Sequence, residues 1–140
     1  MKFLLDSNIV SEASKPSPNL HVLELIKNNR QESSIASVSA FEMLYGIGVL
    51  PDGARKSRLL SYLNDIVFSY YEILPYDFEC SKTHAQILAK LKSVGQMLPY
   101  QDSQIAAIAL ANSLTLVTRN VKDFNPITKY FPLKIENWFV

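Results

Sequence analysis

Residues 99–118, PYQDSQIAAIALANSLTLVT, join one helix directly to one strand. Pro99 and the polar residues after it introduce an alanine-rich helix over Ser103–Asn112, whose small side chains allow close packing against a sheet. Leu114–Thr118 is the clearest strand of the sequence, because it is a short apolar run bounded by polar residues. The stretch therefore predicts a helix that packs on the sheet its strand joins.

The same alternation continues on both sides of this unit. Apolar runs predict strands over residues 3–5, 34–38, 72–74 and 133–135. Helices are expected over residues 9–13, 20–28, 39 to 46 or 48, from the turn at 51–53 to about 67, and 78–94. Strands separated by helices imply a parallel sheet covered on both faces. We therefore expect an α/β fold, a three-layer α/β/α domain with a central parallel sheet, over residues 1–140.

The composition fits one domain with one core, because 48% of the 140 residues are hydrophobic. The single cysteine, Cys80, cannot form an internal disulfide, which agrees with a reducing compartment. No apolar run approaches the roughly 18 residues that cross a bilayer, and Asp6 interrupts the N-terminus before a secretory segment can form. We expect a cytoplasmic protein without a membrane partner. A net charge of +1 is too small for coating nucleic acid through electrostatics alone.

The carboxyl ends of the expected strands carry polar residues. Asp6 directly follows the first strand, and Arg119 and Asn120 directly follow the strand Leu114–Thr118. In open α/β sheets, ligands bind beyond the carboxyl ends of the strands. The functional site is therefore expected at this edge.

Each acidic side chain near this edge also has a purely structural explanation. Asp6 can cap the helix that follows it, and Glu42 with Ser39 has the spacing of a capping box. A negative charge at Asp102, in the first turn of its helix, is favoured by the helix dipole by about 0.3–1 kcal/mol. Asp123 lies in a turn before a phenylalanine and a proline, where an Asx-turn is reasonable.

Three of these acids, Asp6, Glu42 and Asp102, are attached to the starts of helices that open at the same edge of the expected sheet. Carboxylates within a few ångströms repel one another and recruit protons or a cation. Mg²⁺ suits such a cluster, because it prefers oxygen ligands and keeps several waters. His21 and His84 lack the paired spacing of a zinc site, and we expect each to be an ordinary surface or partly buried residue.

Four segments together resemble the PIN-domain ribonuclease toxins of VapBC type II toxin–antitoxin systems, the VapC-like proteins. They are LLDSN (4–8), SAFEMLYG (39–46), PYQDSQIAA (99–107) and VTRNVKDF (117–124), and the ending IENW (135–138) agrees as well. The resemblance spans nearly the whole chain in order and spacing. It implies the PIN fold, a divalent-metal ribonuclease that cleaves RNA, a VapB-like antitoxin as partner, and homodimerisation.

Carried over by position, the resemblance assigns Asp6, Glu42 and Asp102 to the three most characteristic acidic sites. Asp6 and Asp102 would hold Mg²⁺, with Mn²⁺ as a substitute, and Glu42 would complete or orient its shell. Many relatives have an acid directly after the Thr-Arg pair, where this chain has Asn120. Either Asn120 binds a metal-bound water or Asp123 is the fourth catalytic acid, and one or two ions remain open. The supporting residues are Ser7, Asn8, Thr118, Arg119 and Asn120.

Two other functions compete with the ribonuclease. A receiver-like magnesium-binding signalling module also clusters acids at strand ends, but it needs a phosphorylatable Asp at the end of a central strand. A non-catalytic interaction domain would use the acids only as helix caps, so Mg²⁺ would leave its thermal stability unchanged.

Overall fold

The computed structural model describes residues 1–140 and contains one five-stranded sheet in which every strand is parallel to its neighbours. The strand order is β3-β2-β1-β4-β5. Leu4 in the central strand is in register with Ser34 on one side and Leu116 on the other. The strands are β1 (Phe3–Leu5), β2 (Ser33–Ala36), β3 (Glu72–Leu74), β4 (Thr115–Val117) and β5 (Ile135–Glu136).

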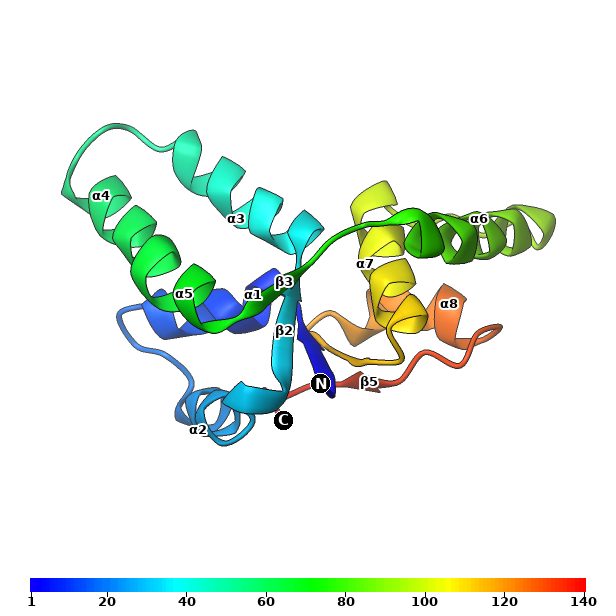
Figure 1. The fold of residues 1–140 in the computed structure, drawn as a ribbon, viewed down its shortest axis with the longest axis horizontal. Helices are drawn as coiled ribbons and strands as arrows, with labels where there is room; N and C mark the ends of the chain where they lie inside the picture. Colours follow the sequence, from blue (N-terminus) through cyan, green and yellow to red (C-terminus); the bar gives the residue numbers. More distant parts are fainter.

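Helices cover both faces of the sheet, so the predicted three-layer α/β/α fold is confirmed (Figure 1). One face carries α1 (Ser7–Val10), the 3-10 turn η1 (Ser11–Ser14), α2 (Leu20–Asn28), α3 (Ser37–Gly48), α4 (Ala54–Ser61), the π-helical η3 (Tyr62–Val67) and α5 (Phe68–Tyr70). The other face carries α6 (Phe78–Ser93), α7 (Tyr100–Ala111) and α8 (Asn125–Thr128). Two 3-10 turns, η2 (Arg30–Glu32) and η4 (Val121–Phe124), complete the chain. No helix is long and apolar enough to cross a membrane.

The central strand β1 feeds two separate cores. Leu4 packs with the buried residues of α6 and α7, whereas Phe3 and Leu5 pack with those of α1 and α3. Successive side chains of a strand point to opposite faces, which explains the division. Each fully buried leucine stabilises the fold by roughly 2 kcal/mol. The two cores fix β1, and with it the position of the residue that follows.

Helix α7 packs as its composition predicts. Ala106, Ala107 and Ala109 are fully buried in the core shared with β1. The helix ends in a Schellman motif, because the Leu114 N–H donates to the Ala109 carbonyl at 2.9 Å and Ser113 adopts φ 56°. This turn reverses the chain into β4.

The prediction of a capping box at the start of α3 is wrong. The helix begins at Ser37 with Ala36 as its N-cap, and no side chain caps it. Ser39 therefore lies within the first turn, where its hydroxyl is buried without a hydrogen-bond partner. One carboxylate oxygen of Glu42, Oε1, is likewise buried and unpartnered. A capping role therefore does not account for the presence of an acid at position 42.

Candidate active site

Asp6 directly follows β1 at the carboxyl edge of the sheet and is only 6% exposed. Three hydrogen bonds orient its carboxylate. The Ser7 backbone N–H donates to Oδ1 at 2.8 Å, while the Thr118 hydroxyl and the Asn8 amide donate to Oδ2 at 2.9 and 3.4 Å. Asp6 also caps α1, so the structural and functional interpretations of this residue coexist.

Thr118 joins the turn after β4 to the turn after β1. Its hydroxyl, fully buried, accepts the Asn120 N–H at 3.1 Å in addition to donating to Asp6. The Asn8 side-chain carbonyl in turn accepts the Arg119 N–H at 3.1 Å. The supporting residues therefore act in different ways: Ser7, Arg119 and Asn120 contribute backbone N–H groups, whereas Asn8 and Thr118 contribute side chains.

Glu42 on α3 and Asp102 on α7 are half-buried and lie within electrostatic reach of Asp6. Burial raises the pKa of Glu42, and the charges of Asp6 and Asp102 raise it further. Burial also raises the pKa of Asp102, with added repulsion from Asp6 and Asp123. These four acids form what we call the carboxylate cluster.

Burial and hydrogen bonding have opposite effects on the pKa of Asp6. Burial raises its pKa most, whereas the hydrogen bonds from Thr118, Ser7 and Asn8 lower it. The charge of Asp123 adds a smaller increase. Asp123 itself is an exposed residue of η4, and Asn120 is exposed just before this turn. Of the two candidates for the fourth acidic position, only Asp123 adds negative charge to the cluster.

The donors of the carboxylate cluster are chemically suited to a hard divalent cation. A cation would relieve the repulsion among the acids and satisfy the unpartnered Glu42 Oε1. No three histidine, cysteine or acidic side chains form a ready-made ligand set in this structure. Mg²⁺ does not require one, because it is commonly bound by one or two carboxylates, with waters and substrate phosphate completing the shell.

A groove of about 810 Å³ adjoins the cluster between α1, η1, α3, α4 and η3. Glu42 and Ser7 line it on the side of the cluster, and three cations, Lys15, Arg55 and Arg58, line it elsewhere. The groove floor includes apolar side chains of α3 and η3. Two arginines of α4, Arg55 and Arg58, thus line the same groove as Glu42 of the carboxylate cluster.

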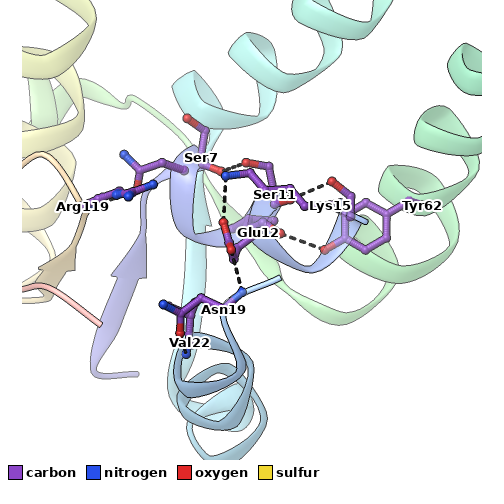
Figure 2. A network of polar contacts seen from close by, with 11 residues as sticks. Ser7, Ser11, Glu12, Lys15, Asn19, Val22, Tyr62 and Arg119 are labelled. Carbon is purple, nitrogen blue, oxygen red and sulfur yellow. Dashed lines mark hydrogen bonds and ion pairs between the residues drawn. The ribbon is translucent and has the colours of Figure 1, made fainter. Parts of the chain in front are cut away.

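Glu12 is a buried acid that sequence reasoning missed, and it belongs to a structural network rather than to the cluster (Figure 2). It is 4% exposed, accepts the Asn19 N–H at 2.7 Å and pairs with Lys15 at 2.9 Å. The bond to Lys15 lowers its pKa most. The network fixes η1 against the start of α2 and sets Lys15 at the groove.

The expectation that both histidines are surface or partly buried residues is confirmed for His21 and wrong for His84. His21 is exposed, as expected, but His84 is 2% exposed and hydrogen-bonded through both ring nitrogens. A signal was present, because residues 80, 84, 87 and 91 share one face of α6 and the other three are apolar. That face is buried against α7.

Comparison with known proteins decides the family. The sequence profile of the PIN domain matches residues 3–128, which include all of the carboxylate cluster. The chain belongs to the PIN-domain family. As a PIN-domain protein it is not a receiver-like module, so that alternative is excluded.

Several bacterial proteins resemble this PIN-domain chain over most of its length. Plasmid stability protein StbB from Pseudomonas syringae pv. tomato is 35% identical over 86% of this chain and 89% of its own. Ribonuclease VapC2 from Rickettsia felis is 31% identical over 99% and 98%. Toxin FitB from Neisseria gonorrhoeae is 31% identical over 86% and 89%. The crystal structure of FitAcB from that organism superposes with a TM-score of 0.88, at 27% identity and 98% coverage of both chains.

Proposed function

We propose that this PIN-domain protein is a Mg²⁺-dependent endoribonuclease and the toxin of a type II toxin–antitoxin pair. The observation that carries the proposal is the carboxylate cluster. In it, burial raises the pKa of Glu42 and the charges of Asp6 and Asp102 raise it further, while its buried Oε1 has no hydrogen-bond partner. The names of the relatives, a ribonuclease VapC2 and a toxin FitB, support the same function.

Asp6 and Asp102 would hold the ion, and Glu42 would orient its shell through water. A bound Mg²⁺ polarises a phosphoryl oxygen and lowers the pKa of a coordinated water. Mn²⁺ would substitute, because it accepts the same oxygen ligands. Thr118, Ser7 and Asn8 keep the Asp6 carboxylate oriented before any ligand arrives. Such preorganisation reduces the reorganisation needed during the reaction.

We assign the fourth catalytic position to Asp123 rather than Asn120. The charge of Asp123 acts on both Asp6 and Asp102, whereas Asn120 contributes a backbone N–H to Thr118. Arg119 stands at the same edge and can pair with a phosphate of the substrate. The three cations of the groove, Lys15, Arg55 and Arg58, would bind phosphates further along the RNA.

A VapB-like antitoxin is the proposed protein partner, a homodimer the proposed assembly and the cytoplasm the proposed location. Support comes from the toxin relative and from large apolar side chains that remain exposed on α3. Phe41 and Tyr45 stack with ring centroids 5.9 Å apart, and both are more than half exposed. Exposed aromatic side chains are enriched at protein interfaces. Co-purification with the product of an adjacent small gene tests this partnership.

Cleavage of a structured RNA with and without chelator tests the activity. Wild-type protein should cleave in Mg²⁺, stop in excess EDTA and recover when Mg²⁺ is restored. Asp6→Asn should lose cleavage by at least about 100-fold while it stays folded, because the amide keeps the shape and removes the charge. Undiminished cleavage in EDTA, or by folded Asp6→Asn, would refute the proposed site.

A further inference from the structure

A hydrogen-bond chain centred on the buried His84 lies beside Asp102 and takes no part in the site described above. His84 Nε2 lies 2.8 Å from the Ser103 hydroxyl, and His84 Nδ1 lies 2.8 Å from the Tyr76 hydroxyl. The Ser103 hydroxyl donates to the Tyr100 carbonyl at 2.7 Å. The chain links α6, through His84, to the first turn of α7.

The proton positions in this chain follow from one bond. The Ser103 hydroxyl has one hydrogen, which it donates to the Tyr100 carbonyl. It can therefore only accept a hydrogen bond from His84, so His84 Nε2 carries a proton. Burial lowers the pKa of His84, which favours the neutral ring. Nδ1 is then bare and accepts the Tyr76 hydroxyl hydrogen. One tautomer satisfies every group.

The position of Asp102 depends on its helical turn. No hydrogen bond contributes to the environment of its carboxylate, in contrast to the three at Asp6. No side chain caps the start of α7 either. Asp102 lies between Tyr100 and Ser103, and His84 contacts both: its ring packs edge-on against Tyr100 at 5.1 Å and bonds to Ser103. The contacts that fix Tyr100 and Ser103 therefore also fix the backbone from which the Asp102 carboxylate extends.

We propose that His84 is a positioning residue for Asp102, acting through its hydrogen bond to Ser103, the next residue in the first turn of α7. The inference rests on the proposed nuclease function, in which Asp102 holds the cation. An apolar side chain at position 84 would fill the same space and keep the packing of α6 on α7, but it would form no directional bond to Ser103. The bond to Ser103 fixes the first turn of α7 relative to α6, and the Tyr76 hydroxyl fixes the ring that makes it.

Two amide substitutions separate this role from simple packing. In His84→Gln, the side-chain nitrogen of the longer amide reaches roughly where Nε2 lies, so this variant keeps a donor for Ser103. In His84→Asn, the shorter amide reaches only the place of Nδ1, so this variant loses the bond to Ser103. Ser103→Ala removes the acceptor with little change in volume. Gln86→Asn, on the exposed face of α6, is the matched control.

The expected result is a drop in kcat of about 10- to 100-fold in His84→Asn and in Ser103→Ala, as is typical for residues that orient a metal ligand. KM for RNA should not change, because neither residue reaches the groove. His84→Gln and Gln86→Asn should cleave at nearly the wild-type rate. The double variant of His84→Asn with Ser103→Ala should be no worse than either single variant, because both remove the same bond.

Two readouts do not depend on cleavage. Imidazole ¹⁵N NMR should find His84 neutral and protonated at Nε2 at pH 7. The Mg²⁺ concentration that gives half-maximal thermal stabilisation should rise in His84→Asn and in Ser103→Ala. If His84→Asn does not fold, Ser103→Ala provides the test.

The outcomes separate this inference from the proposed function. Folded variants that match wild type in kcat and in Mg²⁺ dependence, or a loss equally large in His84→Gln, would overturn the role of His84 alone. Wild-type protein that neither cleaves RNA nor gains stability from Mg²⁺ would overturn the proposed function and this inference together.

Discussion

Replacing Asp102 with asparagine should stabilise the metal-free protein while abolishing its activity. The substitution removes one charge from the carboxylate cluster and sacrifices no hydrogen bond, because only burial and the charges of Asp6 and Asp123 perturb this carboxyl. Interactions between partly exposed charges are typically worth up to about 1 kcal/mol, because solvent screens them. We expect a gain of about 0.5–1 kcal/mol in the free energy of unfolding at pH 7, or roughly 2–4 °C in Tm.

The pH dependence of this gain follows from the direction of the pKa shift. The folded pKa of Asp102 is raised above its ordinary value of 3.8, so ionisation costs stability at any pH above the folded value. As the pH falls through the folded pKa toward 3.8, wild type takes up a proton in the folded state and the cost disappears. The advantage of Asp102→Asn should therefore be largest near neutral pH and vanish below about pH 4.

Thermal unfolding in EDTA and in Mg²⁺ provides the assay, with the exposed Asp65→Asn as the control for loss of a charge elsewhere. In Mg²⁺, wild type should gain stability by mass action, whereas Asp102→Asn should gain little. Asp65→Asn should behave as wild type in both conditions. The reasoning is refuted if Asp102→Asn destabilises the metal-free protein at pH 7, or if its advantage is the same at pH 4 and pH 7.

Three further predictions concern the frame of the site, the groove and the fold. Thr118→Val should lower the free energy of unfolding measured in urea by about 1.5–3 kcal/mol, because it removes a hydrogen-bond donor to a buried charged carboxylate. The loss of this bond should also raise the pKa of Asp6, so the acid limb of the pH–rate profile should move to higher pH. Arg58→Glu should raise KM for RNA with kcat unchanged, and the slope of log affinity against log salt should become shallower by about 0.7. Ser113→Gly should raise the free energy of unfolding by about 1 kcal/mol, because Ser113 adopts φ 56°, and calorimetry would measure it.

Local chemistry made much of the fold predictable. Helix α2 has the expected bounds, Leu20–Asn28, because Asn19 caps the Val22 N–H at 3.1 Å before an amphipathic run. The strand Glu72–Leu74 also matches. Errors occur where neighbouring residues offer equivalent signals: both Ser37 and Ser39 could open α3, and the choice depends on where β2 stops pairing with β3 at Ala36. Periodicity alone does not contain that information.

The acids of the candidate site could be proposed from the sequence, whereas the hydrogen bonds that surround them could not. Asp6, Glu42 and Asp102 could be proposed from sequence, since each was expected at a strand end or near a helix start on the carboxyl edge, although Glu42 lies in the second turn of α3. The bond from Thr118 to Asp6 spans 112 positions, and that from His84 to Ser103 spans 19. Such pairings are set by how strands and helices pack, so a single sequence carries only weak hints of them. The apolar residues on one face of α6 were one such hint, because they indicated that His84 is buried. The sequence around Glu12 gave no indication that this acid is buried.

Anomalous diffraction from crystals soaked in Mn²⁺ is the most direct test of whether the acids share a cation. Our account predicts an anomalous peak within coordination distance of Asp6 and Asp102, with Glu42 at or next to its shell. The peak should be lost in Asp6→Asn crystals prepared in the same way. A fully occupied Mn²⁺ elsewhere on the molecule, with no density among these carboxylates, would contradict it.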